Sequence, residues 1–209
     1  SILNDRGGRY NIGNLNEIKL SKFPDLYIAA DWERAYREKN QVAPIDIHNG
    51  LTADELSMTN SSSTVDLLVQ GNLEFILDLT NETVLFDFYE VIKDIKLPKK
   101  LEAEAKRLNI AVPYHVKSRN ELIKSILQCN WRDMPVQVDI PSNSQIFGQL
   151  AHESGIEAIL YPSRMSSEKK CLAIFTKNFE KSNSYVKIQD QNIPNAIKHS
   201  ELNSESYIY

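Results

Sequence analysis

The sequence predicts an α+β fold, a mixed β-sheet core with flanking helices, and three observations support this class. Segments with strand patterns and helix patterns follow one another without the regular alternation of a doubly wound sheet. Hydrophobic residues make up 42% and charged residues 25%, which are ordinary values for a globular protein with a real core. The chain has 209 residues, enough for one large domain, and it shows no internal repeat.

The first regular elements follow an opening loop. Residues 25–30, DLYIAA, are mostly apolar and predict a short strand. Asp31 stands at a natural N-cap position, and the residues after it, WERAYREKN, predict a helix. We expect this helix to bury an apolar stripe formed by Trp32, Ala35 and Tyr36.

The middle of the chain is less regular. The polar stretch at 61–63 predicts a flexible loop. Residues 72–81, NLEFILDLTN, predict a strand with one face made of Leu73, Phe75, Leu77 and Leu79. The next segment, TVLFDFYEVIKDI, fits either a strand or a helix.

Three later segments predict helices. Residues 98–110 are rich in helix-forming residues. Ser118 and Glu121 have the spacing of a capping box, which predicts a helix from 119 to about 128. Residues 142–155 predict a helix that ends at Gly155, with Ile146, Leu150 and Ala151 on one stripe.

The last part of the chain predicts strands. IEAILYPS and KCLAIFT are apolar runs joined by a polar loop, and SYVKIQD predicts the final strand. The polar tail 191–209 is expected to be loose.

Composition excludes several classes of function. A net charge of -4 argues against direct nucleic-acid binding, although a local cationic pocket for a phosphorylated metabolite stays open. The sequence has no apolar run long enough for a membrane span and no secretory signal pattern. Cys129 and Cys171 form no disulfide framework, and the four histidines lack metal-ligand spacing. We therefore expect a cytoplasmic protein with reduced thiols and no metal.

The opening stretch NDRGGRYNIGNL concentrates three glycines and two arginines in a chain with only seven glycines. Glycines let a backbone approach a ligand closely, and the guanidinium of Arg9 fits phosphate oxygens. The stretch is neither a Walker loop nor a dinucleotide-binding Rossmann fingerprint. Taken alone, it fits a tight turn beside a solvated arginine better than it fits a ligand-binding loop.

Three further residues stand at places where functional side chains occur. Tyr27 lies within the first strand, Glu38 in the last turn of the following helix, and Ser163 at the end of ILYPS. Individually, each is ordinary: a core tyrosine, a surface glutamate and a serine at a strand end. Their order in the chain carries more information than any one of them.

The succession GGRYN, LYIAADWERAYRE, SQIFGQLAHESGIEAILYPS and CLAIF resembles the RES domain family, the toxin component of many bacterial toxin–antitoxin pairs. The family is named after an arginine, a glutamate and a serine, which match Arg9, Glu38 and Ser163. Tyr27 matches the family's strand tyrosine. Ala35 fits the small helix residue before the glutamate, and Gln145 fits a glutamine that opens a later helix.

The resemblance implies an ADP-ribosyltransferase-like fold, with a single NAD-binding domain over 1–190 and a helical insertion at about 94–136. It implies NAD as substrate, with inorganic phosphate as one candidate co-substrate. A helix-turn-helix (Xre-type) antitoxin is implied as partner, and a homodimer stays open.

The chemistry of NAD fits these residue types. Nicotinamide leaves the ribose as a neutral molecule and needs no general acid, so one carboxylate suffices. Glu38 would stabilise the cationic ribose, and Arg9 would hold phosphates. Tyr27 would stack on nicotinamide, at about 0.5–2 kcal/mol, and Ser163 would orient the ribose or the amide.

Three functions remain open at this point. The first is an NAD-degrading toxin that transfers ADP-ribose to phosphate (a phosphorylase) or to water (a glycohydrolase). The second is a protein ADP-ribosyltransferase. The third is an inactive RES-like binding module, for which the helices of 94–136 would offer a docking face.

Overall fold

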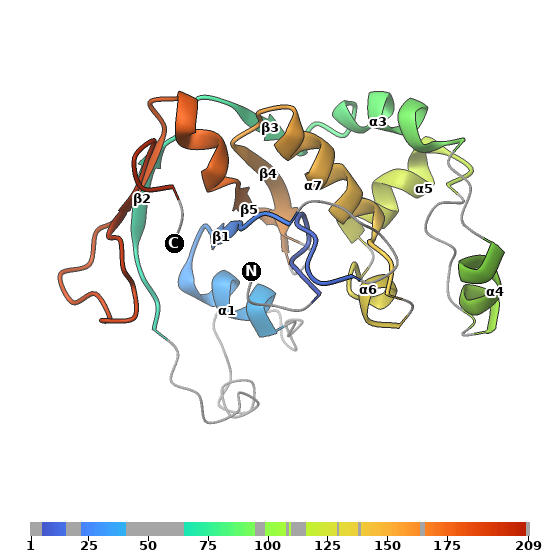
Figure 1. Ribbon diagram of the computed structural model, residues 1–209, viewed down its shortest axis with the longest axis horizontal. Coiled ribbons are helices and arrows are strands. Elements are labelled where there is room, and N and C mark those ends of the chain that lie inside the picture. Colours follow the sequence, from blue (N-terminus) through green and yellow to red (C-terminus); the bar gives the residue numbers. More distant parts are fainter. Residues whose placement is uncertain are drawn as a thin grey trace.

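The computed structural model describes residues 6–15, 22–40, 65–94, 99–107, 109, 116–128, 130–137, 139–163 and 166–207. It has a four-stranded mixed sheet, a second three-stranded sheet and helices around them, which confirms the predicted α+β class (Figure 1). The loop predicted at 61–63 and Cys129 lie outside the described residues. No helix in the described part of the chain has the length and apolar character needed to cross a lipid bilayer.

The central sheet has the strand order β1-β5-β4-β3. Its strands are β1 (Leu26–Ala29), β3 (Ile76–Asp78), β4 (Ala158–Ser163) and β5 (Ser166–Ile174). β5 pairs antiparallel with both β1 and β4, whereas β3 pairs parallel with β4. The strands predicted from DLYIAA, IEAILYPS and KCLAIFT are thus confirmed, and they are neighbours in one sheet.

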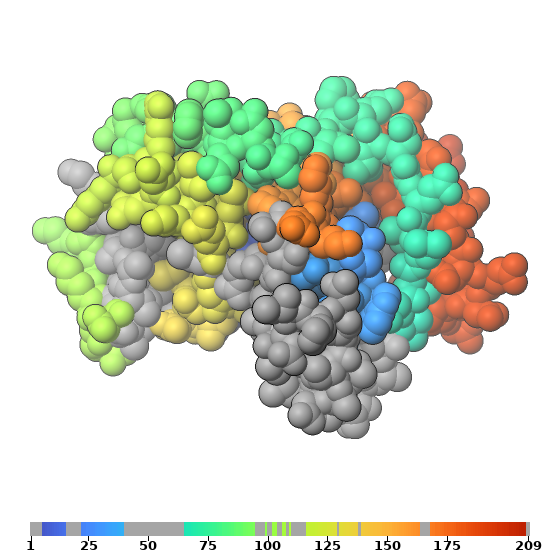
Figure 2. All heavy atoms as spheres, turned by 180° about the vertical axis from the view of Figure 1, so that it is seen from behind, coloured from blue at the N-terminus to red at the C-terminus, as the bar shows by residue number. Residues whose placement is uncertain are grey.

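The second sheet contains β2 (Val69–Asn72), β6 (Tyr185–Ile188) and β7 (Glu201–Leu202). The tail was expected to be loose, but β7 pairs with β6, and Leu202 is buried. That expectation of looseness was wrong because one apolar residue in a polar stretch suffices to dock a two-residue strand. Figure 2 shows this sheet at one end of the described molecule, in teal and red.

The strand predicted for 72–81 is broken. The chain turns between β2 and β3, and the buried carboxylate of Glu157 holds the turn. Its Oε2 accepts the backbone N–H of Glu74 (2.8 Å) and Phe75 (3.0 Å) and the hydroxyl of Ser184 (2.7 Å). Phe75, expected on the buried face, is 57% exposed. Apolar alternation could not reveal this break, because an acid far along the chain causes it.

Helices lie around and beside the central sheet. They are α1 (Trp32–Asn40), α3 (Val84–Ile92), α4 (Lys99–Arg107), α5 (Arg119–Ile123), the π-helical η1 (Lys124–Gln128), α6 (Asp133–Gln137), α7 (Asn143–Glu153) and the 3₁₀ helix η2 (Thr176–Lys181). α3 settles the ambiguous segment TVLFDFYEVIKDI as a helix. Whether the helices between 94 and 136 form an insertion stays a prediction.

The predicted helix starts are confirmed by their caps. Asp31 accepts the backbone N–H of Arg34, and Ser118 accepts that of Glu121. The side chain of Glu121 accepts the N–H of Lys117, one residue before the position that a capping box would use. Gly155 has φ +81, as expected of a residue that ends α7.

The apolar stripes predicted for two helices were partly wrong. On α1, Trp32 is 54% exposed and Ala35 is also exposed, while Tyr36 is buried beside two arginines. On α7, Leu150 is 37% exposed, although Ala151 is buried as expected. Both helices turn a partly polar face inward, because that face contacts the opening loop or the residues around it.

Candidate active site

The opening loop is a compact turn. Gly7 and Ile12 form an isolated β-bridge, and the N–H of Gly8 donates to the backbone oxygen (3.1 Å) and to Oδ1 (2.7 Å) of Asn11. Gly7 has φ +76, a conformation that favours glycine. One reason for the glycines is therefore the turn itself.

Gln145, in the first turn of α7, ties this loop to the helix. Its Nε2 lies within hydrogen-bond distance of the backbone oxygens of Arg6 (2.8 Å), Gly8 (3.0 Å) and Asn11 (3.2 Å). Its Oε1 accepts the N–H of Ser142 and completes a capping box. The side chain is fully buried, so its N–H donors and its acceptor oxygen bond to protein groups and not to water.

The loop also contacts α7 directly. A Cβ at Gly148 would lie 1.9 Å from the carbonyl oxygen of Tyr10, so only glycine admits this approach. The ring of Tyr10 packs edge to face on Tyr161 of β4, with 5.0 Å between ring centroids. The backbone on both sides of Arg9 is consequently fixed.

Tyr27 supports the loop from β1. Its hydroxyl accepts the N–H of Tyr10 (2.8 Å), lies 3.3 Å from Oδ1 of Asn11 and hydrogen-bonds the Asp25 carboxyl. A Cβ at Gly8 would lie 2.5 Å from the Tyr27 ring, which explains the second glycine. The N–H groups of Gly8 and Tyr10 are thus occupied, so the loop presents the side chain of Arg9 and not these two amides.

Arg9 is a buried cation, with 5% of its surface exposed. Its guanidinium lies 5.2 Å from the centroid of the Tyr161 ring, a cation–π contact. Among the described residues, Nη1 of Arg9 has no hydrogen-bond acceptor. Burial opposes the charge, but Tyr10, Tyr161 and Glu38 outweigh it and raise the pKa of Arg9. The guanidinium therefore stays charged and keeps a donor for a ligand.

Glu38 and Ser163 form a hydrogen-bonded pair. The hydroxyl of Ser163 donates to Oε1 of Glu38 at 2.6 Å, a short bond typical of a charged acceptor. Ser163 is buried at the end of β4, where the pairing with β5 shifts register, and Glu38 is partly exposed near the end of α1. Two residues that are 125 positions apart thus meet at the end of β4.

The charge of Glu38 reaches the same cluster that holds Arg9. Its carboxylate helps to raise the pKa of Arg9, Tyr10 and Tyr161, after burial as the main cause for the two tyrosines. Burial, followed by Glu38, raises the pKa of Cys171 to about 12. This free, buried thiol stays protonated and is not a candidate nucleophile. Among the described residues, the cluster thus brings together the buried cation of Arg9, the carboxylate of Glu38 and tyrosine side chains that stay neutral.

Of the four predicted residues, Glu38 contacts Ser163 at the end of β4, Arg9 packs on Tyr161 of the same strand, and Tyr27 supports the loop that carries Arg9. Their catalytic and binding roles stay predictions. The sequence did not predict that Tyr10 and Tyr161 pack around Arg9, or that Arg34 is buried on α1. Tyr10 and Tyr161 stand next to or near predicted residues in GGRYN and LYPS, and that proximity was the only signal for them.

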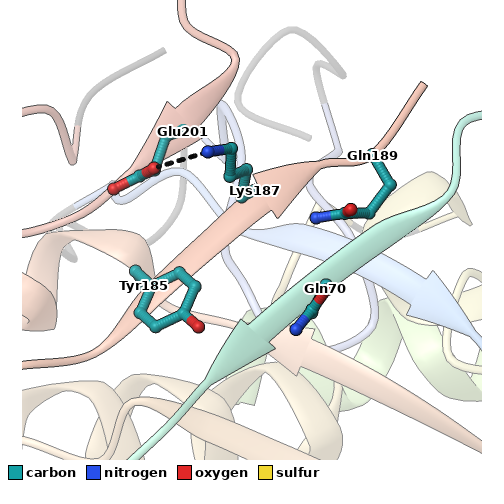
Figure 3. Close-up of a pocket in the computed structure, with 5 residues that line it drawn as sticks. All are labelled: Gln70, Tyr185, Lys187, Gln189 and Glu201. Atoms are coloured by element: carbon teal, nitrogen blue, oxygen red, sulfur yellow. Dashed lines mark ion pairs between the residues drawn. The ribbon is translucent and has the colours of Figure 1, made fainter. Parts of the chain in front are cut away.

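A separate groove lies on the second sheet. It has a volume of about 390 Å³ and is lined by Gln70, Tyr185, Lys187, Gln189 and Glu201 (Figure 3). Lys187 pairs with Glu201 at 3.7 Å, the contact dashed in the figure. None of the predicted site residues lines this groove. Its charged side chains are well exposed and already paired, so we do not place the active site there.

No metal site is evident. Within the described ranges, no group of three or more His, Cys, Asp or Glu side chains is placed to hold a metal ion. The groups that suit a ligand are instead the cation of Arg9, for phosphate oxygens, and the Glu38–Ser163 pair, for a sugar.

Comparison with known proteins gives one family. A model described as RES domain matches residues 2–194, nearly the whole chain. No curated protein and no solved structure matches.

Replacing Gln145 by glutamate separates its contact with the loop carbonyls from its cap on α7. The new carboxylate keeps an acceptor for the N–H of Ser142 but turns an oxygen toward the loop carbonyls. We expect Gln145→Glu to lower the free energy of unfolding by at least about 3 kcal/mol at pH 7, because the carbonyls face a buried negative charge. The loss should shrink as the pH falls, since a protonated carboxyl donates again.

Urea unfolding at two pH values measures this effect. The matched control is Gln137→Glu, at an exposed glutamine of α6, which should change stability little. Equal unfolding midpoints for the two variants would show that Gln145 does not hold the loop.

Asp25 gives a pH prediction. It is 1% exposed, and burial raises its pKa from 3.8 to about 8, against the opposing effect of its hydrogen bond to Tyr27. The folded state holds a proton that the unfolded chain releases, so the contribution of Asp25 to stability falls as pH rises from about 4 to about 8 and then levels. Asparagine cannot ionise, and Asp25→Asn should therefore be more stable than the parent at pH 8.

The measurement is thermal unfolding between pH 5 and 8, with the exposed Asp66→Asn as control. The advantage of Asp25→Asn should narrow toward pH 5, where the parent carboxyl is neutral. An advantage that is constant with pH contradicts the assignment.

Proposed function

The chain belongs to the RES domain family, and on that premise we propose that it cleaves the bond between nicotinamide and ribose in NAD. The observation that carries the proposal is the grouping of a buried, charged Arg9 with the hydrogen-bonded pair of Glu38 and Ser163. Cleavage of this bond in NAD needs a cation that binds the phosphates and a carboxylate that stabilises the positive charge on the ribose.

The reaction needs little acid–base chemistry. The C1′–N bond breaks with both electrons passing to the pyridinium nitrogen, so nicotinamide leaves as a neutral molecule. Positive charge develops on the ribose, and a nucleophile then forms the new bond to C1′. With water the products are ADP-ribose and a proton, and with phosphate the product is ADP-ribose that carries a phosphate on C1′.

Glu38 would stabilise the developing positive charge. A fixed carboxylate beside that charge acts without reorganising in the reaction, which is the source of electrostatic catalysis. Ser163 fixes the carboxylate by donating to its Oε1. Since Glu38 is partly exposed, a substrate can reach it from solvent.

Arg9 would bind the diphosphate of NAD or the attacking phosphate. It has an unused Nη1 donor, and the surrounding tyrosines stay neutral because burial raises the pKa of Tyr10 and Tyr161. Stacking of Tyr27 on nicotinamide remains part of the proposal. The contacts of its hydroxyl support a second role, which is to position the loop that carries Arg9.

The biological setting that we propose is the family's. The protein would act as a toxin that depletes NAD, held inactive by a helix-turn-helix antitoxin that covers the site. Protein ADP-ribosylation and a purely binding role are the alternative outcomes of the experiments below.

We expect Arg9→Ala and Glu38→Gln each to slow NAD consumption by about 10²-fold or more, because each removes a fixed charge next to the reacting centre. Nicotinamide release by the purified protein is the readout. Arg119→Ala and Glu168→Gln are matched controls at exposed positions and should keep the parental rate. Parental rates for both Arg9→Ala and Glu38→Gln would refute the site assignment.

Mass spectrometry of the products identifies the acceptor. ADP-ribose with a phosphate on C1′, formed only when phosphate is present, indicates a phosphorylase. ADP-ribose formed both with and without phosphate indicates a glycohydrolase. ADP-ribose attached to protein indicates a transferase. Intact NAD after long incubation contradicts all three and leaves the binding module.

A further inference from the structure

Arg34 is a second buried arginine beside the proposed site. It lies in the first turn of α1, one helical turn before Glu38, and positions four residues apart share a face of a helix. Its backbone N–H donates to Oδ1 of Asp31 at 2.8 Å, which fixes the start of the helix. Only 8% of its surface is exposed.

The guanidinium of Arg34 lacks the partners that buried cations normally have. Its Nε and Nη1 are buried, and no described residue accepts a hydrogen bond from either atom. Arg37 provides the contrast on the same helix. It is 2% exposed, and its Nε donates to Glu33 at 2.8 Å. One helix thus carries two buried arginines: Arg37 has a carboxylate partner, and Arg34 has none among the described residues.

Arg34 and Arg9 belong to groups that meet on β4. Glu38, one helical turn after Arg34 on α1, accepts a hydrogen bond from Ser163 at the end of β4, and Arg9 packs on Tyr161 of the same strand. Cys171 of β5 pairs with Ala29 on one side and with Tyr161 on the other, and the charges of Glu38, Arg9 and Arg34 all act on its thiol. The region therefore contains two cations, Arg9 and Arg34, whose buried donors have no acceptor among the described residues. One oxygen of the Glu38 carboxylate already accepts a hydrogen bond from Ser163.

A buried cation without a partner is unfavourable, because its hydration is lost and nothing replaces it. An anion between two such cations removes this cost. Guanidinium groups suit phosphoryl oxygens best, since their planar fork donates two parallel hydrogen bonds. A carboxylate of the protein would serve as well, but the only one found in this cluster among the described residues is Glu38.

We propose that Arg34, together with Arg9, binds the oxygens of a phosphoryl group. The proposal deepens the proposed function and rests on it for the identity of the ligand, which is either the diphosphate of NAD or inorganic phosphate. Two guanidinium groups offer donors either for one phosphoryl group that both bind or for one phosphoryl group each. Arg34 is thus a binding residue and takes no part in breaking the glycosidic bond.

The test measures binding without turnover. Inorganic phosphate and ADP-ribose carry no nicotinamide, and calorimetry follows each with the parent protein, Arg34→Gln and Arg34→Lys. Arg119→Gln removes an exposed arginine and is the matched control. We expect Arg34→Gln to weaken at least one ligand about tenfold or more, Arg34→Lys to weaken it less, and the control to bind as the parent does.

The pattern of losses identifies the source of the phosphoryl group. Loss of phosphate binding alone indicates the co-substrate, and loss of ADP-ribose binding alone indicates the dinucleotide. Loss of both indicates a shared position. Each pattern supports the proposal, whether or not the protein consumes NAD, so failure of the reaction and failure of this site are seen separately.

Two results would overturn it. The first is binding of both ligands to Arg34→Gln within twofold of the parent. The second is an unliganded Arg34→Gln protein with a Tm several degrees below the parent, because that result assigns Arg34 a partner inside the fold. On our account the unliganded variant melts at the parental temperature or above, since it lacks a buried, unpaired charge.

Discussion

The candidate site depends on the contact between the side-chain amide of Gln145 and the backbone of the opening loop. The loop has no regular structure beyond one β-bridge, so it cannot fix the direction of Arg9 by itself. A single buried amide next to the oxygens of Arg6, Gly8 and Asn11 supplies what a ladder of backbone bonds supplies elsewhere. The same side chain caps α7, so the start of the helix and the shape of the loop are fixed together. Gly148 and Tyr27 then close the loop from two sides.

This support places the charge of Arg9 in surroundings that strengthen its interactions. Arg9 is almost wholly buried against Tyr161, where hydrogen bonds and ion pairs are stronger than in water. The tyrosines and Cys171 keep their protons, so Glu38 carries the negative charge of the described cluster. Ser163 holds that charge at the end of β4. Buried arginine donors together with a fixed carboxylate suit a substrate that carries phosphates at one end and develops a sugar cation at the other.

The sequence predicted what depends on neighbouring residues. Strand patterns located β1, β4 and β5, the caps at Asp31 and Ser118 marked two helix starts, and the pattern of 142–155 located α7. Motif order indicated Arg9, Glu38 and Ser163, two of which are in direct contact. It could not predict what depends on distant partners. The carboxylate of Glu157 holds the break at Phe75, and β7 forms by pairing with β6. On α1, Arg34 is buried where the apolar periodicity had predicted that Trp32 would be. In each case the packing of segments far apart in the chain decides the outcome, and the local pattern does not.

The most direct test of the central claim is a crystal structure with an NAD analogue whose glycosidic bond cannot be cleaved. We predict phosphate oxygens about 3 Å from the guanidinium of Arg9 and the nicotinamide ribose against the carboxylate of Glu38. An analogue bound in the groove of the second sheet, with Arg9 still packed on Tyr161 and without a ligand, would contradict the account.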